Sequence, residues 1–143
     1  MATLALLPTE DSINPYANRI KLSHTPFVVT PPTSEVRWVT HVAGQLAQTA
    51  DELILIFVGE VSIHAPAIGF SRRSLRRPAV GYVLIDPVMP KIGGDYSDWP
   101  DAPVTVVLTQ VASDLAKEAS LQAKLRGWEI TTKPIDEVLT GLY

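Results

Sequence analysis

Short apolar runs, separated by polar and proline-containing segments, recur along the whole chain. The clearest run is Leu53–Val58 (LILIFV), which is continuous and apolar, as expected of a strand buried on both faces of a sheet. Five further runs predict strands at Thr3–Leu7, Phe27–Thr30, Val80–Ile85, Val104–Leu108 and Trp128–Thr132. The 12 prolines mark loops, because Pro fits neither a helix interior nor a central strand.

Segments with apolar residues at helical spacing lie between most of these strands. The strongest runs from Ser34, a suitable N-cap, to about Ala50. Ser113 is a second N-cap, and Gly127 ends the helix that follows it. The other helices are expected at Asn14–Leu22, Ser62–Leu75 and Pro134–Leu142.

The alternation of strands and helices predicts an α/β fold. We expect a three-layer, doubly wound, mostly parallel sheet of six strands with helices on both faces. The 143 residues form a single expected domain, 1–143, because a chain of this length leaves little room for a second core.

The composition excludes several kinds of site and argues against several kinds of partner. The chain has no Cys, which excludes a disulfide framework, a thiolate zinc site and a Cys nucleophile. A net charge of -3 argues against a general nucleic-acid binder. The longest apolar run is far shorter than the roughly 20 residues of a membrane helix, and the N-terminus has no basic leader. We therefore expect a cytoplasmic protein with neither nucleic acid nor membrane as its partner.

The segment LILIFVGEVSIHAPAIG, from Leu53 to Gly69, resembles the strand, turn and helix that carry the nucleophile in the α/β-hydrolase superfamily. Downstream, GYVLIDPVMP, DWPDAPVTVVLTQVASD and LRGWEITTKP resemble the later strands of that fold. The resemblance covers the chain from about Thr3 to Leu142. It implies a sheet of order 2-1-3-4-5-6, which is the family's sheet without its first two strands.

This strand order also implies a place for a ligand. The order reverses between the first and third strands, and ligands of open α/β sheets bind there, outside the carboxyl ends of the strands. The residues expected around this crevice are Thr9, Glu10, Asp11, Ser12, Gly59, Glu60, Val61 and Ser62.

The family's catalytic motif, G-x-S-x-G, is incomplete in this chain. Gly59 matches the first Gly, but Val61 stands at the nucleophile position and Ile63 at the second Gly. Asp114 matches the acid, yet no His follows the sixth strand. Because a triad without nucleophile or base loses nearly all its rate enhancement, we expect a family-like domain without hydrolytic machinery.

A weak serine hydrolase with a non-standard site is the alternative. Ser62 and His64 lie two residues apart and could be a shifted nucleophile with its own base; Ser12 is the other candidate. Residues two apart on a helix point to different faces, however, so Ser62 is more simply interpreted as a helix N-cap.

Carboxylates at the sheet's carboxyl end raise the question of metal binding. Asp86 follows the fourth strand, where it either faces the crevice or starts a turn before Pro87. Together with Glu10, Asp11 and Glu60 it offers oxygen ligands that hard cations accept. Their spacing follows no metal-binding motif, so neither a metal nor another cofactor is expected.

Arg72, Arg73, Arg76 and Arg77 form the one strong charge cluster. At the end of a predicted helix, these cations oppose the negative end of the helix dipole. A patch that binds an anion is the alternative interpretation.

The sequence thus predicts a non-catalytic binding module for a small molecule or another protein. A homodimer is expected through an exposed edge strand or its flanking helix, with Trp128 in the sixth strand favoured. A flavodoxin-like module unrelated to hydrolases is a third alternative. It would need a phosphate-cradling loop, and Glu60 places a carboxylate where the phosphate would lie.

Overall fold

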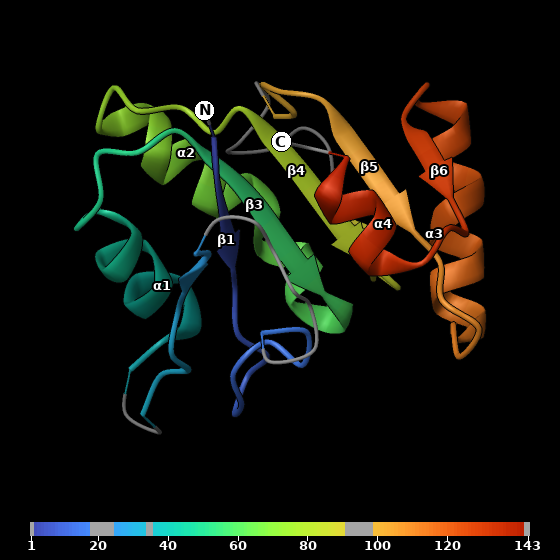
Figure 1. Cartoon of the computed structure of the whole chain (residues 1–143), viewed down its shortest axis with the longest axis horizontal. Coiled ribbons are helices and arrows are strands. Elements are labelled where there is room, and N and C mark those ends of the chain that lie inside the picture. Colours follow the sequence, from blue (N-terminus) through green and yellow to red (C-terminus); the bar gives the residue numbers. More distant parts are fainter. Residues whose placement is uncertain (1, 18–24, 34–35, 91–98, 142–143) are drawn as a thin grey trace.

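Six parallel strands form one sheet in the order β2-β1-β3-β4-β5-β6 (Figure 1). This computed structural model describes residues 2–17, 25–33, 36–90 and 99–141. The strands are β1 (Thr3–Leu6), β2 (Phe27–Val28), β3 (Leu53–Val58), β4 (Gly81–Ile85), β5 (Val104–Val107) and β6 (Glu129–Thr131). The predicted α/β class, the six strands and their order are confirmed.

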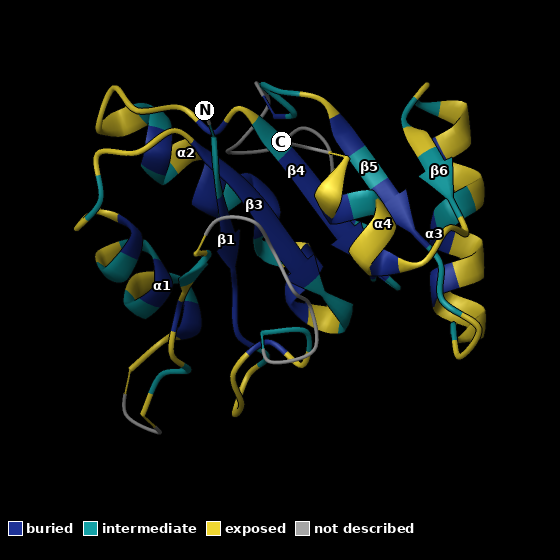
Figure 2. Ribbon diagram, in the orientation of Figure 1, coloured by how far each residue is buried: buried dark blue, intermediate teal, exposed yellow. Residues whose placement is uncertain are grey.

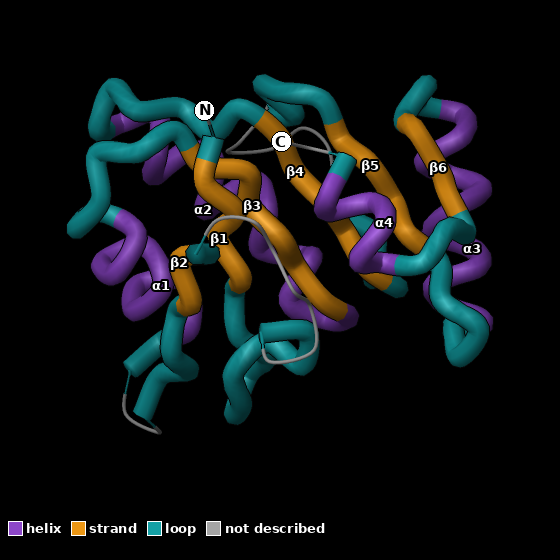
Figure 3. The backbone as a smooth tube through the Cα atoms, viewed as in Figure 1, coloured by secondary structure: helices purple, strands orange, loops and turns teal. Residues whose placement is uncertain are grey.

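Helices lie on both faces of the sheet but cover them unequally. The helical segments are α1 (Trp38–Leu46), the 3-10 helix η1 (Gly59–His64), α2 (Ala65–Ser74), α3 (Asp114–Leu125) and α4 (Ile135–Thr140). Figure 3 shows α1, α2 and α3 on the far side of the sheet and the short α4 on the near side. No helix in the described ranges has the length and apolar character to cross a membrane.

Two apolar clusters, one on each face, sandwich β3. Leu53, Leu55 and Phe57 point into the cluster under α1, α2 and α3, while Ile54 and Ile56 point into the opposite one. Figure 2 shows the central strands buried along almost their whole length. This two-sided burial explains why β3 is apolar at every position.

Capping residues in the sequence predicted the ends of one helix correctly and the start of another incorrectly. Ser113 accepts a hydrogen bond from the Ala116 N–H at 3.2 Å, and Gly127 has a φ of 76°, so both predicted ends of this helix are confirmed. The helix predicted from Ser34 begins at Trp38 instead, and Ser34 itself lies outside the described residues. Of the helix predicted at Asn14–Leu22, residues 14–17 form a turn, and 18–22 lie outside the described residues.

Arg72, near the end of α2, is a buried hydrogen-bonding centre. The side chain is 1% exposed. Its guanidinium donates to the backbone carbonyls of Leu46, Asp51 and Arg77, at 2.8, 3.2 and 3.1 Å. Burial lowers the pKa of Arg72, and the charge of Arg77 lowers it further. One side chain therefore ties together the end of α1, the loop before β3 and the loop after α2.

The arginine cluster is consequently not a single surface patch. Arg72 and Arg73 do lie in the last turn of α2, as the helix-dipole interpretation requires. Arg73 forms an ion pair with Asp101 at 3.1 Å. Arg76 and Arg77 are exposed beyond the helix end. Arg77 nevertheless donates to the Thr49 carbonyl at 3.4 Å.

Replacing Arg72 tests its structural role. We expect Arg72→Met to lower the free energy of unfolding by about 2–3 kcal/mol, because three carbonyls lose a charged donor in a buried site. Arg76→Met removes an exposed arginine nearby and should change it by less than about 0.5 kcal/mol. Urea denaturation followed by tryptophan fluorescence measures both. Equal unfolding midpoints for the two variants would contradict the assignment.

Candidate functional site

The Trp38 side chain lies between the loop after β1 and the turn after β3, where the sequence predicted a crevice. The Trp38 indole N–H donates to the Thr9 carbonyl at 3.1 Å. The same indole stacks on His64, with ring centroids 5.1 Å apart and planes at 25°. Trp38 is 8% exposed. The first residue of α1 therefore packs into the place where the sequence predicted a crevice.

The loop after β1 is held by its own hydrogen bonds. The Thr9 N–H donates to the Ser12 carbonyl at 2.9 Å, and the Ser12 N–H donates to the Thr9 hydroxyl at 3.1 Å. Both hydroxyls also donate to Asp11. Glu10 is exposed beside His64, where its charge raises the pKa of His64. Burial lowers that pKa by more, so the net direction is downward.

The turn after β3 is part of the core. Gly59 has a φ of 66°, a conformation that glycine adopts without strain, and the chain enters η1 directly from it. Val61, at the family's nucleophile position, is 1% exposed, and Ser62 is 0% exposed. Glu60 is exposed in the first turn. The position that the resemblance assigns to the nucleophile is closed to solvent.

The candidate catalytic residues do not form a triad. The Ser62 hydroxyl is buried without a hydrogen-bond partner among the described residues. Ser12 is exposed and bonded to Asp11, and Asp114 begins α3 at an exposed position. No hydrogen bond in the described ranges joins Ser62, His64 and Asp114.

Ser62 is not the helix N-cap that the sequence predicted. His64 precedes α2, and no side chain caps it. The prediction was wrong because the chain becomes helical at Gly59, which places Ser62 inside the 3-10 turn.

Asp86 has a role that the sequence only partly predicted. Its φ of 45° makes it a turn residue after β4, as one interpretation held. Its carboxylate also accepts hydrogen bonds from the Thr109 N–H, at 2.8 Å, and from the Thr109 hydroxyl. Asp86 thereby fastens the loop after β5 to the end of β4.

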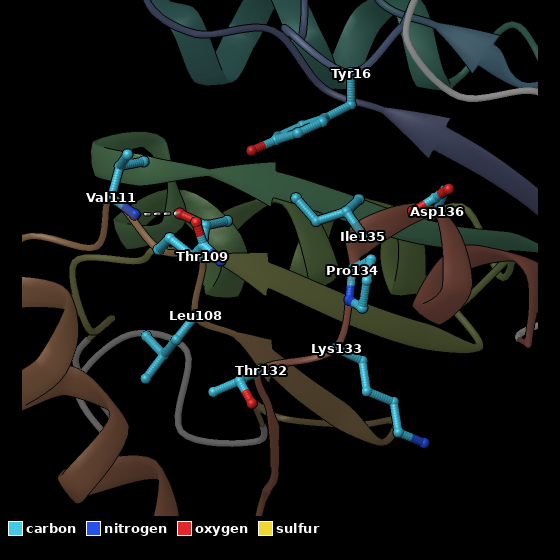
Figure 4. A pocket seen from close by; sticks show the side chains of 10 residues that line it. Tyr16, Leu108, Thr109, Val111, Thr132, Lys133, Pro134, Ile135 and Asp136 are labelled. Atoms are coloured by element: carbon cyan, nitrogen blue, oxygen red, sulfur yellow. Dashed lines mark hydrogen bonds between the residues drawn. The ribbon is translucent and has the colours of Figure 1, made fainter.

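A cavity of about 520 Å³ opens beside this loop, at the carboxyl ends of β5 and β6 (Figure 4). One wall is the loop after β5, and another is the segment that leads from β6 into α4. The phenol ring of Tyr16 lies across from both. The lining residues are Tyr16, Leu108, Thr109, Gln110, Val111, Thr132, Lys133, Pro134, Ile135 and Asp136.

Sequence reasoning missed this cavity. Among its lining residues, Thr109 and Ile135 belong to no chemical motif, and Tyr16 is more than ninety positions away from either. The available signal was general, since ligands bind at carboxyl ends of parallel strands. Because of the resemblance, the ligand site was predicted at the ends of β1 and β3, whereas the cavity lies at the ends of β5 and β6.

The carboxylates that the sequence analysis considered as metal ligands are not gathered into a site. In the described part of the chain, no three His, Asp or Glu side chains are placed to hold a metal ion, and this includes Glu10, Asp11, Glu60 and Asp86.

No known family model matches this sequence, and neither a curated protein nor a solved structure matches the chain. The resemblance to α/β-hydrolases therefore rests on the quoted sequence segments.

A substitution at Val61 tests the closed turn. Val61→Ser should lower the free energy of unfolding by about 1 kcal/mol or more, because it buries a hydroxyl in an apolar site. It should create no esterase activity toward p-nitrophenyl acetate, because position 61 is closed to solvent and the His64 imidazole is stacked on Trp38. Thermal denaturation and an absorbance assay measure the two effects.

The matched control is Val111→Ser, the same change at a valine that is 86% exposed. It should leave the unfolding free energy within about 0.5 kcal/mol. A gain in thermal stability for Val61→Ser would contradict the burial argument. Stoichiometric labelling of Ser62 or Ser12 by a fluorophosphonate in the unmodified protein would favour the serine-hydrolase alternative.

Proposed function

We propose that this chain is a non-catalytic, α/β-hydrolase-like binding domain that holds a small molecule at the carboxyl ends of β5 and β6. The cavity is the observation that carries the proposal. Its volume of about 520 Å³ lies within the range of small-molecule sites, roughly 300–1,000 Å³. Such sites combine an apolar lining with a few polar groups, as this one does.

The walls of the cavity are fixed before any ligand arrives. Asp86 holds Thr109, and the Val111 N–H donates to the Thr109 hydroxyl at 3.3 Å. Ile135 is 9% exposed and packs into the core cluster on this face. Preformed walls favour binding because little conformational entropy is lost when the ligand enters.

The arrangement supports binding more than catalysis. The Thr109 hydroxyl donates to the Asp86 carboxylate and accepts from the Val111 N–H, and both hydrogen bonds hold the loop after β5 in place. Ser62 is sealed from solvent, and Ser12 bonds to Thr9 and Asp11 but to no His in the described ranges. The weak serine hydrolase therefore has less support. A cytoplasmic location stays part of the proposal, since a chain without Cys suits a reducing compartment.

A fragment screen by NMR tests the binding site. Small aromatic and aliphatic fragments should shift the amide resonances of residues 108–111 and 132–136 more than those of residues 59–64. Val111→Trp should abolish these shifts by filling the cavity mouth, at little cost in stability because Val111 is 86% exposed.

Leu125→Trp is the matched control, because Leu125 is 88% exposed and does not line the cavity. It should leave the shifts unchanged. Shifts confined to residues 59–64, or none anywhere for a diverse library, would contradict the proposed site.

Self-association is a second proposal. On its outer side β6 pairs with no strand in the described ranges, and α3 beside it exposes Leu121 by 65% and Leu125 by 88%. Exposed leucines one helical turn apart are typical of an interaction surface. Trp128 packs edge-on against Trp99 at 5.5 Å, so the leucines are the cleaner positions to test.

Light scattering at micromolar concentration should give about twice the chain mass of 15.6 kDa. The double variant Leu121→Glu, Leu125→Glu should return the mass to that of one chain. Leu75→Glu, at a leucine 42% exposed at the end of α2, should not. A single-chain mass for the unmodified protein would reject the dimer.

A further inference from the structure

The walls of the cavity also indicate the kind of molecule that it takes. Resting on the proposed function, we propose that the ligand is a flat, uncharged aromatic molecule that lies against the ring of Tyr16. Three features of the cavity support this: a fixed aromatic wall, a fixed apolar wall opposite, and a lining without net charge.

The aromatic wall is fixed through Asn14. Asn14 is 1% exposed, and its side-chain amide donates to the Leu7 carbonyl at 2.9 Å, just after β1. Its amide oxygen accepts from the Tyr16 N–H at 3.0 Å. Tyr16 also packs against the apolar cluster on this face of the sheet. The ring is therefore part of the fold rather than a free surface side chain.

The opposite wall faces the ring. Figure 4 shows the Tyr16 ring nearly edge-on, with one face turned toward Ile135 and Thr109. Ile135 is anchored in the core, and Thr109 is clamped by Asp86. A space between a ring face and an apolar wall suits a planar group, and aromatic pairs gain stabilisation beyond their buried area.

Charge in the lining is balanced and peripheral. Lys133 and Asp136 are its charged residues, one of each sign, and both are exposed. The Lys133 ammonium points away from Tyr16 in Figure 4. A charged ligand between the walls would lose its hydration without gaining a buried partner. The Thr132 hydroxyl and the Gln110 amide offer neutral hydrogen bonds instead.

Four probes separate these requirements: 2-naphthol, its saturated counterpart 2-decalol, the anion 2-naphthoate and the cation 2-naphthylmethylammonium. In NMR titrations of the full chain, 2-naphthol should bind with the lowest Kd and shift residues 108–111 and 132–136. Tyr16→Leu should raise the Kd of 2-naphthol about three- to tenfold, because it keeps an apolar wall but removes the ring. Its effect on 2-decalol should be less than about twofold.

Tyr16→Phe is the conservative control, since it keeps the ring and should leave the Kd of 2-naphthol within about twofold. Circular dichroism and unchanged amide spectra away from the cavity establish that both variants fold. Equal binding of 2-decalol and 2-naphthol, or tighter binding of either charged probe, would overturn the ligand class while leaving the cavity as the site. Cavity shifts from other fragments but from neither alcohol would do the same. Only the absence of cavity shifts for every fragment would overturn the proposed function itself.

Discussion

The fold depends on covering both faces of β3. Each of its first five residues is buried, so the apolar groups on both sides need partners. The first face receives three helices, α1, α2 and α3. In the described ranges the second receives only the short α4 and the Asn14–Ala17 turn. These two segments approach from the same direction, because each follows the carboxyl end of a strand. The cavity lies between them, with Tyr16 on one side and Ile135 on the other.

Two hydrogen-bonded clamps turn loops at that edge into fixed walls. Asn14 fastens the segment after β1 to the Leu7 carbonyl, and Asp86 fastens the loop after β5 to the end of β4. Backbone groups satisfy the Asn14 amide, and the N–H and hydroxyl of Thr109 satisfy the Asp86 carboxylate. At the first crevice the corresponding space is taken by Trp38, whose indole bonds to Thr9 and stacks on His64. Trp38 thus covers the carboxyl ends of β1 and β3, whereas the carboxyl ends of β5 and β6 border the cavity.

The parts of this structure that the sequence could predict are those decided locally. A continuous apolar run placed β3 with its exact ends, and Ser113 and Gly127 placed both ends of one helix, because caps act on adjacent backbone groups. The strand order came from the resemblance, since periodicity does not encode which strands are neighbours. Ser62 was misplaced because a 3-10 turn began earlier than the apolar spacing suggested. The buried hydrogen bonds of Arg72 and the place of Tyr16 in the cavity wall were missed for another reason. Their partners lie in other elements, and only the folded chain brings them together.

The turn after β3, which the resemblance compares with the nucleophile turn of hydrolases, is closed, and the cavity lies at other strands. A nucleophilic turn has to present its side chain to a substrate and keep a base within hydrogen-bond reach. Here Val61 and Ser62 are packed inside, and the imidazole of His64, in the same 3-10 helix, stacks on Trp38. Beside the cavity, by contrast, the Thr109 hydroxyl donates to the Asp86 carboxylate and accepts from the Val111 N–H, and so holds a loop. Asp86 and Thr109 thus stabilise a wall of the cavity, and the proposed ligand is left with the ring of Tyr16, the shape of the cavity and the neutral groups of Thr132 and Gln110.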